Sequence, residues 1–259
     1  MSESKPRFIW YELATTDPEG AEVFYRAVVG WSTADAGPSG LRYTILSAGD
    51  RGMGGLTALP PEAAGAGARP TWRGYVGVPD TDGAAKRIVE EGGAIHHGPD
   101  DIPGVGRFAV VADPGGAVFM LLTPLPREDA PPPAEPGMPG LVSWHELYAS
   151  TGQEAAFRFY RDQFGWETTE LMDMGPMGKY RIFGAEGAAM GGMMDKPENV
   201  PASAWGFYVN VDGLDAAIER IRAHGGQVRM GPEQVPGGSW IVQALDPQGA
   251  AFALVSTTR

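Results

Sequence analysis

Two glutamates follow a tryptophan at the same spacing in two distant parts of the sequence. Trp10 precedes Glu12 by two residues, and Trp144 precedes Glu146 in the same way. Side chains two residues apart on a strand point to the same face of a sheet. A carboxylate beside an indole in a cavity suits proton transfer, or hydrogen bonding to a ligand hydroxyl. The pattern predicts that Glu12 and Glu146 are catalytic or ligand-facing; the alternative is a buried glutamate paired with a structural arginine.

These pairs belong to a repeat that extends over most of the 259 residues. The spacing between matching residues drifts by only a few positions. Beyond the Trp-x-Glu-Leu segments, the matches are Phe24-Tyr25 with Phe159-Tyr160, Gly30-Trp31 with Gly165-Trp166, Met53-Gly54-Gly55 with Met190-Gly191-Gly192, and Asp113-Pro114 with Asp246-Pro247. Duplication of a unit of roughly 130 residues explains the repeat, and that is a usual size for a domain.

A proline-rich segment marks the boundary between the two halves. Pro124 to Pro139 contains seven prolines, together with charged residues. This composition favours an extended linker over a packed element. We therefore expect a first domain over residues 6–125, a linker over 126–139 and a second domain over 140–258.

Within each half, stretches typical of strands alternate with helical patterns. Asp17 is a suitable N-cap with Pro18 at the first helical position, and apolar residues recur at helical spacing up to Val28 before Gly30 ends the helix. Short strands follow the predicted helices, at 42–48, 108–112, 117–123, 179–184, 240–245 and 250–256. The pattern thus predicts two modules in each half, and each module consists of a strand, a helix and about three further strands. Four such modules make an α+β fold.

The composition disfavours several classes of partner and chemistry. Thirty-two acidic residues oppose twenty basic ones, for a net charge of −12, which disfavours binding to nucleic acids or to anionic membranes. The absence of cysteine excludes disulfides and thiolate chemistry. No segment has the pattern of a signal peptide or a membrane helix. We expect a cytoplasmic protein, monomeric or homodimeric, whose partner is a small molecule.

In their order, these modules resemble the vicinal oxygen chelate superfamily, which includes glyoxalases, bleomycin-resistance proteins and extradiol dioxygenases. The chain is most similar to the two-domain, glyoxalase-like members found in bacteria. The resemblance implies two glyoxalase-like domains, each a cup-shaped half-barrel made of paired βαβββ modules, with the ligand in the cup. The residues that carry it are Thr15-Thr16-Asp17, Phe24 to Trp31, Phe159 to Trp166, and the Asp-Pro-x-Gly turns Asp113 to Gly116 and Asp246 to Gly249.

Metal-binding members of this superfamily carry a His or Glu on the first strand of a module and a Glu on the last strand. The corresponding residues here are Trp10, Arg73, Trp144 and Gly206 on first strands, and Met120 and Ala253 on last strands. Indole, thioether and methyl groups do not bind divalent cations of the usual kind. The resemblance therefore implies that the usual metal centre has been lost. No cofactor is expected, although a divalent metal is not excluded.

The positions expected to face the cups are rich in aromatic side chains. They predict a flat, apolar or aromatic ligand, and the alternative is an ordinary core. Arg107 either binds a carboxylate or enolate ligand or forms a salt bridge with Glu12, and Arg73 is open to the same two interpretations. The predicted substrate-binding residues are Trp10, Arg73, Tyr75, Arg107, Met120, Trp144, Tyr208 and Trp240.

Two functions of different classes fit these expectations. The first is a glyoxalase/bleomycin-resistance-like protein that binds a small aromatic or carbonyl-containing molecule in its cups without a metal. The second is a lyase, isomerase or oxygenase acting on a small carbonyl or phenolic substrate, with Glu12 or Glu146 as general base and metal assistance left open. Since this scaffold hosts many activities, the fold does not decide between them. We favour the first.

Overall fold

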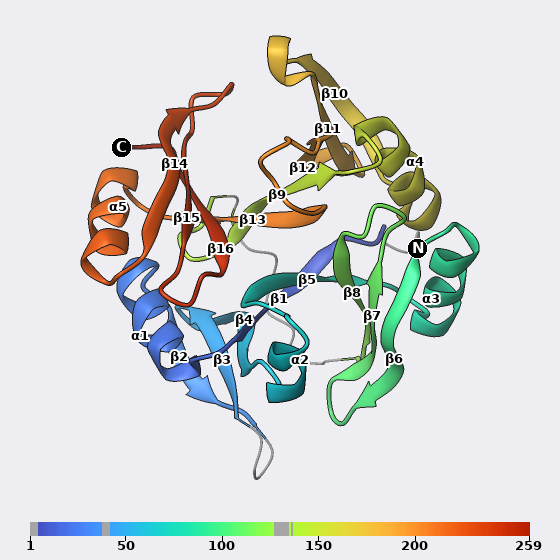
Figure 1. Cartoon of the computed structure of the whole chain (residues 1–259), viewed down its shortest axis with the longest axis horizontal. Helices are drawn as coiled ribbons and strands as arrows, with labels where there is room; N and C mark the ends of the chain where they lie inside the picture. Colours follow the sequence, from blue (N-terminus) through green and yellow to red (C-terminus); the bar gives the residue numbers. More distant parts are fainter. Residues whose placement is uncertain (1–4, 38–41, 127–134, 136) are drawn as a thin grey trace. The chain divides into compact units, whose positions relative to one another are not determined.

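The computed structural model describes residues 5–37, 42–126, 135 and 137–259, and Figure 1 shows their helices and strands. The first module consists of β1 (Phe8–Thr15), α1 (Pro18–Val28), β2 (Ser32–Asp35), β3 (Tyr43–Ala48) and β4 (Arg51–Ala58). The second consists of β5 (Thr71–Gly77), α3 (Thr81–Glu90), β6 (Ala94–Ile102), β7 (Gly106–Ala112) and β8 (Val118–Pro124). A short helix, α2 (Pro61–Gly65), connects them.

The second half repeats the same order of elements. The third module consists of β9 (Val142–Ala149), α4 (Gln153–Phe164), β10 (Glu167–Asp173), β11 (Lys179–Ala185) and β12 (Ala188–Asp195), with a short 3-10 helix, η1 (Gly175–Met177), before β11. The fourth consists of β13 (Ala204–Asn210), α5 (Leu214–Ala223), β14 (Gln227–Gln234), β15 (Trp240–Leu245) and β16 (Ala251–Ser256). The four predicted modules and the α+β class are confirmed.

Each half of the chain forms one eight-stranded mixed sheet. The strand order is β2-β3-β4-β1-β5-β8-β7-β6 in the first half and β10-β11-β12-β9-β13-β16-β15-β14 in the second. Within a module the first strand runs parallel to the last, so that Glu12 of β1 lies beside Gly55 of β4. Glu146 of β9 lies beside Gly192 of β12 in the same register. The duplication has therefore preserved the environment of the two glutamates at the level of the backbone.

Helix α1 begins and ends where the sequence predicts. The side chain of Asp17 accepts a hydrogen bond from the backbone N–H of Gly20 (3.0 Å), and Pro18 is the first helical residue. This cap satisfies one of the backbone donors that a helix start leaves without a partner. Gly30, with φ at +90°, follows the helix in a conformation that favours glycine.

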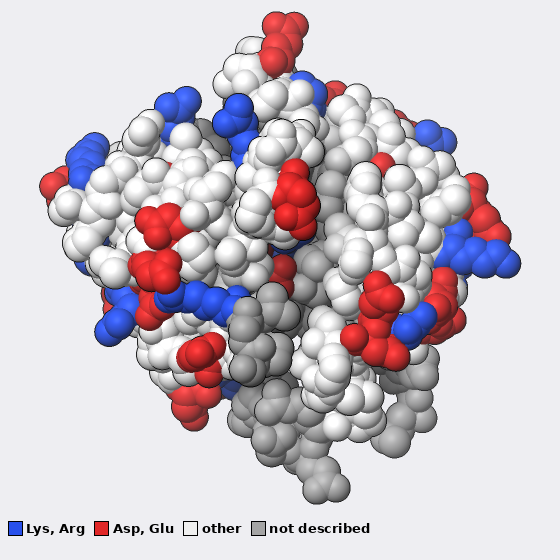
Figure 2. Space-filling model, turned by 60° about the horizontal axis from the view of Figure 1, so that its bottom comes forward, with Lys and Arg blue, Asp and Glu red and all other residues white. Residues whose placement is uncertain are grey.

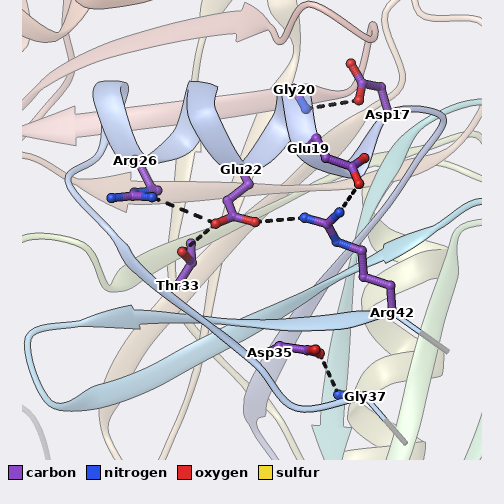
Figure 3. Close-up of polar contacts among 9 residues, drawn as sticks. All are labelled: Asp17, Glu19, Gly20, Glu22, Arg26, Thr33, Asp35, Gly37 and Arg42. Atoms are coloured by element: carbon purple, nitrogen blue, oxygen red, sulfur yellow. Dashed lines mark hydrogen bonds and ion pairs between the residues drawn. The ribbon is translucent and has the colours of Figure 1, made fainter. Parts of the chain in front are cut away.

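A network of charged side chains fixes α1 to the strands that follow it (Figure 3). Arg42 forms ion pairs with Glu19 and Glu22, and Glu22 also accepts a hydrogen bond from Thr33 (2.6 Å). Surface ion pairs of this kind contribute no more than about 1 kcal/mol each. Their position on α1 indicates a structural role, and they do not contribute to the site described below.

The strands that the sequence did not indicate are mostly exposed. Residues on both faces of β6 are exposed or half-buried, and the same holds for β14. Both are edge strands of their sheets. An edge strand with little buried surface has no need for alternating apolar residues, so the pattern used to recognise strands is missing from it.

Packing groups the chain into two compact units. Unit 1 comprises Met1–Ile9, Arg73–Ala130 and Trp144–Trp205, and unit 2 comprises Trp10–Trp72, Pro131–Ser143 and Gly206–Arg259. Unit 1 is thus built mainly from the second and third modules, and unit 2 from the first and fourth. The predicted linker over 126–139 lies largely outside the described residues, and the domain boundaries drawn from the sequence stay a prediction.

In unit 2, a buried pair of hydrogen bonds joins the first module to the fourth. The indole N–H of Trp72 donates to the hydroxyl of Tyr25 (2.9 Å), which donates to Asp246 (3.1 Å). The other carboxylate oxygen of Asp246 accepts backbone N–H groups from Gln248 and Ala250. The tyrosine of the Phe-Tyr motif and the aspartate of the Asp-Pro-x-Gly turn therefore belong to one structural feature.

Unit 1 contains the equivalent arrangement between the third module and the second. Trp205 donates to Tyr160 (2.9 Å), and Tyr160 donates to Asp113 (3.0 Å). Asp113 also accepts the backbone N–H groups of Gly115 and Ala117. We call these two sets of three side chains, one in each unit, the Trp–Tyr–Asp triads. Each holds together elements that come from different halves of the sequence.

The tryptophans of the two Gly-Trp motifs fix the segments that lead into the first strands. Trp31 donates its indole N–H to the carbonyl of Gly140, just before β9, within unit 2. Trp166 donates to the carbonyl of Pro6, just before β1, within unit 1. The repeated motif thus positions the start of the strands that carry the candidate glutamates.

Charged side chains are spread over the surface. On the face shown in Figure 2, acidic and basic residues alternate with uncharged ones, and the described Lys and Arg side chains form no continuous patch there. None of the helices in the described part of the chain is long and apolar enough to cross a membrane.

Candidate functional site

In unit 1, Trp144, Tyr180 and Glu146 are linked by two hydrogen bonds. Trp144 donates its indole N–H to the hydroxyl of Tyr180 (2.9 Å), and this hydroxyl donates to Glu146 Oε1 (3.0 Å). Trp144 and Glu146 are half-buried, whereas His145 and Leu147, which alternate with them on β9, are buried. Trp144 and Glu146 therefore share a face of β9, as the sequence predicts.

That face is the one turned away from helix α4. Arg181 is the neighbour of Tyr180 on β11, and it donates to Gln153 at the start of α4 (2.7 Å). Its guanidinium also lies 4.9 Å from the ring centre of Phe157 in the same helix. Since Arg181 points toward α4, Tyr180 points to the opposite face. We call this face, opposite to the one on which α4 packs, the open face.

Unit 2 contains the same arrangement on its own strands. Trp10 donates to the hydroxyl of Tyr43 (3.0 Å), and Tyr43 is hydrogen-bonded to Glu12. Tyr11, between Trp10 and Glu12, lines an apolar cavity together with Tyr25 of α1, so its neighbours on β1 point away from α1. We call the sets Trp10–Tyr43–Glu12 and Trp144–Tyr180–Glu146 the Trp–Tyr–Glu triads. Glu12 is only 8% exposed, so the unit 1 triad is the more accessible of the two.

The second glycine of each Met-Gly-Gly motif makes room for the tyrosine of the triad. A Cβ atom at Gly55 would lie 2.0 Å from the hydroxyl of Tyr43, and one at Gly192 would lie 2.2 Å from that of Tyr180. The register of the neighbouring strand shifts beside both motifs, so each strand pair contains a β-bulge there. Only glycine allows the phenol ring to lie flat across the strand at this point.

The hydrogen bonds of the triad have a fixed direction. An indole can only donate, so the tyrosine hydroxyl accepts from it and gives its own proton to the carboxylate. Burial raises the pKa of Tyr180 well above its usual value, and the negative charge of Glu146 adds to this effect. Burial and Glu12 act on the pKa of Tyr43 in the same way. Both phenols therefore keep their protons, and each triad ends in a carboxylate that acts as an acceptor.

His145 belongs to the core beneath the triad. Its ring stacks on Phe8 at 4.4 Å between ring centres, and it is 7% exposed. Its Nδ1 lies 2.7 Å from the carbonyl oxygen of Met190, and because a carbonyl only accepts, Nδ1 carries the hydrogen. Burial lowers the pKa of His145 to about 4. The imidazole is therefore neutral near pH 7 and points away from Glu146.

Arg107 lies on the other side of its sheet from the position we expected. It forms ion pairs with Asp82 of α3 (2.5 Å) and with Asp101 of β6 (3.0 Å). On β7 it alternates in phase with Ala109 and Val111, which are fully buried. The ion-pair interpretation is therefore the one that the geometry supports, with surface carboxylates of unit 1 as partners in place of Glu12. Arg107 does not line the open face.

Trp240, the repeat equivalent of Arg107, also departs from its predicted place. It shares a face of β15 with Val242 and Ala244, which are buried where α5 packs on that strand. The guanidinium of Arg259 lies 5.0 Å from the centre of its ring, a cation–π contact. The side chain thus belongs to the helix-covered face of unit 2.

The remaining predicted residues alternate onto the open faces. Tyr75 lies directly beside Met120 in the parallel pair β5–β8 of unit 1, with Arg73 two residues before it on β5. In unit 2, Tyr208 lies beside Ala253 and accepts a hydrogen bond from Gln243 (2.7 Å). Tyr75, Met120 and Tyr208 are buried, at 3–4% exposure, and their ligand-binding role stays a prediction.

The residues at the metal-ligand positions do not fit a divalent cation. Met120 and Ala253 occupy the last-strand positions, next to the phenol rings of Tyr75 and Tyr208. Among the described residues there is no group of three or more His, Cys, Asp or Glu side chains that could hold a metal ion. Thioether, methyl and phenol groups do not replace such a group. We therefore derive no step through a metal.

The apolar cavity of unit 2 is not a ligand site of useful size. Tyr11, Tyr25, Trp31 and Phe207 are among the side chains that line it, and its volume is about 10 Å³. That is room for roughly one water molecule. It lies on the helix side of the sheet, so the open faces remain the candidate site.

Sequence reasoning assigned no site role to the two tyrosines of the triads. Tyr43 and Tyr180 occupy equivalent places in the repeat, but spacing alone does not distinguish them from the other repeated aromatic residues. The signal that identifies them is their combination with the Met-Gly-Gly motif, since the second glycine is required by the phenol ring. A tyrosine and a glycine that recur together, on strands that pair with each other, indicate a specific contact.

Comparison with known proteins places the chain in a family. It is 30% identical over 249 residues to the Mycobacterium tuberculosis protein named "Putative glyoxylase CFP32". The alignment covers 95% of this chain and 93% of that protein. It is 28% identical over 263 residues to the anthracycline biosynthesis protein DnrV of Streptomyces peucetius, covering 95% of this chain and 91% of that one.

Solved structures show the same fold at low sequence identity. The Mn(II)-bound glyoxalase from Novosphingobium aromaticivorans matches with a TM-score of 0.64 and 15% identity, over 99% of this chain and 83% of that one. The 2,3-dioxygenase LapB from Pseudomonas sp. KL28 matches with a TM-score of 0.64 and 13% identity, over 97% and 91%. A family model matches residues 7–121 and 145–254. The chain therefore belongs to the glyoxalase/bleomycin resistance protein/dioxygenase superfamily.

Proposed function

We propose that this protein binds a small aromatic or carbonyl-containing molecule in the cytoplasm, on the open faces that carry the Trp–Tyr–Glu triads, and without a metal. The observation that carries the proposal is the repetition of the same hydrogen-bonded triad in both units. Indole and phenol rings offer flat apolar surface, and the carboxylate offers a polar group held in one place. The side chains at the metal-ligand positions do not suit a divalent cation, which supports binding without a metal.

The relatives are compatible with either part of the ligand description. One is named as a protein of anthracycline biosynthesis, which is compatible with an aromatic ligand. Another carries the name of a glyoxylase, which is compatible with a small carbonyl compound. These names belong to the relatives, and the argument for this chain rests on Trp144, Tyr180 and Glu146.

Calorimetric titration of protein treated with EDTA tests the proposal. The compounds are a panel of naphthalene and anthraquinone derivatives and of small α-ketoaldehydes. We expect at least one to bind, and Trp144→Ala to weaken that binding by about tenfold or more, since an aromatic contact contributes roughly 1 kcal/mol beyond the area it buries.

Trp240→Ala is the matched control for this titration. It removes a half-buried indole from the same chain, but from the face that α5 covers, so binding should stay at the level of the unaltered protein. Equal losses in both variants would contradict the proposed site. Binding that appears only after Mn²⁺ is added back would contradict the metal-free part.

The second candidate function is catalysis, and the position of Glu146 favours it. The carboxylate is half-buried and hydrogen-bonded to Tyr180, so it is oriented and can be reached by a substrate proton. In that case Glu146 would act as general base on a small carbonyl or phenolic substrate. Glu146→Gln should then abolish turnover while the midpoint of urea unfolding stays within experimental error. Turnover that survives this substitution would rule out the role.

A further inference from the structure

One row of side chains distinguishes the open face of unit 1 from that of unit 2. It crosses four neighbouring strands, β10, β11, β12 and β9 (Figure 1), and we call it the thioether row: Met172, Tyr180, Met194 and Tyr148. We propose that the thioether row selects the ligand by size, so that unit 1 binds compounds of three or more fused aromatic rings. The inference rests on the proposed function and narrows it to one unit and one class of aromatic compound.

The pairing of the strands places these side chains in one row. Met172 on β10 lies directly opposite Tyr180 on β11, and Tyr180 lies opposite Met194 on β12. Met194 in turn lies beside Tyr148 on β9. Residues that pair across neighbouring strands point to the same face of a sheet, which here is the open face. Met193, next to Met194, is fully buried where α4 packs on β12, as alternation requires.

Unit 2 keeps the tyrosine of this row but not its neighbours. Tyr43 on β3 lies opposite Thr57 on β4, which lies beside Ala14 on β1. On the other side, the carbonyl of Tyr43 accepts a hydrogen bond from the backbone N–H of Ala36. Unit 2 therefore has alanine or threonine at each of the three positions where unit 1 has methionine or a second tyrosine.

The large side chains of the thioether row are not needed to hold its tyrosine. Without them, Tyr43 accepts a hydrogen bond from Trp10 and is bonded to Glu12, as Tyr180 is to the equivalent residues. The triad and its glycine are the same in both units, whereas the residues beside the tyrosine differ. Holding the tyrosine thus does not explain the methionines of unit 1, and contact with a ligand does.

The chemistry of the row suits a flat apolar ligand. Its four side chains are all half-buried, so each keeps some surface exposed. The phenol ring of Tyr180 lies flat over Gly192 and turns a ring face, not an edge, away from the sheet. Methionine side chains adapt their shape and make favourable contacts between sulfur and aromatic rings. Aromatic surface at the centre of the row is therefore extended by thioethers on both sides.

The length of the row indicates the size of the ligand. Neighbouring strands lie about 4.8 Å apart, so a row across four strands spans roughly 14 Å. A single ring stacked on Tyr180 covers one strand, whereas three fused rings along the row also reach Met172 or Met194. In unit 2 the same direction offers only small side chains beside Tyr43. The gain from a larger ring system should therefore come from unit 1.

A series of neutral alcohols with one, two and three fused rings tests the inference. Benzyl alcohol, naphthalenemethanol and anthracenemethanol carry the same hydroxymethyl group. Fluorescence titration of the full chain at neutral pH gives their affinities, and equilibrium dialysis gives the number of molecules bound. We expect affinity to rise with each added ring, because each buries further apolar surface, and one anthracenemethanol to bind per chain. Larger rings leave water more readily in any case, so the variants decide whether the thioether row is responsible.

Met172→Ala and Met194→Thr give unit 1 the residues that unit 2 has at these positions. We expect each to weaken the binding of anthracenemethanol about threefold to tenfold, the range for one contact between sulfur and an aromatic ring, and to change that of benzyl alcohol by less than about twofold. Met172 lies on the edge strand β10, so Met172→Ala keeps the test possible if Met194→Thr does not fold.

Met177→Ala is the matched control. It removes a methionine that is 59% exposed in η1, between the same two strands β10 and β11. The binding of all three alcohols should stay at the level of the unaltered protein, because the thioether row does not include this residue.

The size selection and the proposed function fail in different ways. If Trp144→Ala weakens the binding of the alcohols but neither Met172→Ala nor Met194→Thr reduces the preference for anthracenemethanol, the size selection is overturned and the aromatic site stands. The same conclusion follows if Met177→Ala has as large an effect, or if two molecules of anthracenemethanol bind per chain. If none of the alcohols binds, or if Trp144→Ala has no effect, both are overturned.

Discussion

The two Trp–Tyr–Asp triads and the Trp–Tyr–Glu triad of unit 1 use the same two hydrogen bonds in different surroundings. In each, an indole donates to a phenol and the phenol donates to a carboxylate, at closely similar distances. Asp113 and Asp246 are 4% and 2% exposed, and backbone N–H groups of their own turns occupy their second oxygen. Glu146 is half-buried, on the face of β9 opposite to α4. The bonding pattern alone therefore does not identify a site, and burial together with backbone partners separates a scaffold from a site.

Electrostatics separate the two kinds of triad further. Burial raises the pKa of Asp113 and Asp246, although hydrogen bonds from backbone N–H groups and from tyrosine act in the opposite direction. Burying each carboxylate costs desolvation free energy, and its hydrogen bonds hold two modules together. The carboxylates of the open faces are not held by turns of this kind, and each accepts a hydrogen bond from a tyrosine of its own module.

Removing the carboxylate from each kind of triad should give the largest contrast. Asp113→Ala leaves the hydroxyl of Tyr160 and two backbone N–H groups buried without an acceptor, and we expect a loss of about 3–5 kcal/mol in the free energy of unfolding. Glu146→Ala should cost less than about 1 kcal/mol, because water can reach Tyr180. Urea unfolding measures both. Equal losses would make Glu146 part of the scaffold.

His145, on the buried side of β9, should contribute a pH dependence to the stability. His145 has a pKa of about 4 in the folded chain, against 6.5 for an ordinary histidine. Between these values the unfolded chain binds a proton that the folded chain does not, so stability falls as the pH falls from 6.5 to 4. The contribution lost is about 3 kcal/mol. Unfolding free energies measured at several pH values test it.

His145→Phe is the variant that isolates this contribution. It keeps a ring stacked on Phe8 and gives up the hydrogen bond to Met190, at a cost of about 1 kcal/mol at pH 7. Its stability should fall less steeply than that of the unaltered protein as the pH is lowered to 4. Parallel pH profiles would mean that His145 is not responsible.

Deleting one hydroxyl from each kind of triad should give a smaller contrast. Tyr160→Phe leaves Asp113 and the indole of Trp205 each without one buried partner, and we expect a loss of about 1–2 kcal/mol. Tyr180→Phe should cost less than about 0.5 kcal/mol, because its partners are partly exposed to water. Thermal unfolding compares the two variants under one condition. A reversed order would show that the open face is the less hydrated of the two.

The smallest contrast between two variants should come from the glycine beneath the triad of unit 1. In Gly192→Ala, the new methyl group overlaps the ring of Tyr180, and the ring must turn away at a cost of about 1 kcal/mol. The near-UV circular dichroism of Trp144 and Tyr180 should change. Gly65→Ala is the control, since nothing lies within 4 Å of the position. An unchanged spectrum in Gly192→Ala would mean that the phenol does not depend on the glycine.

The sequence predicted the fold class and the modules because the repeat supplied each element twice. It also predicted that Trp144 and Glu146 share a face, since strand alternation follows from spacing alone. Arg107 and Trp240 lie on the helix-covered faces of β7 and β15. Alternation along a strand does not say which of its two faces a helix covers, so spacing alone does not place these two side chains.

Contacts between distant parts of the chain were beyond the reach of the sequence. Tyr25 and Asp246 each belong to a recognised motif, but 221 positions separate them, and spacing along the chain does not specify which motifs meet. The exposed edge strands β6 and β14 were missed because they bury too little surface to show a pattern. A motif that recurs along the sequence therefore marks its residues as important, but it does not show which other residues they contact.

The Trp–Tyr–Asp triads have a consequence for how this protein can be divided. Each compact unit draws its residues from before and after the proline-rich segment, so a gene cut at that segment would encode two fragments that each lack half of both cores. Neither fragment should fold alone, whereas co-expressed fragments should complement each other. Duplication followed by fusion has in this way produced two halves that each need the other to complete their cores.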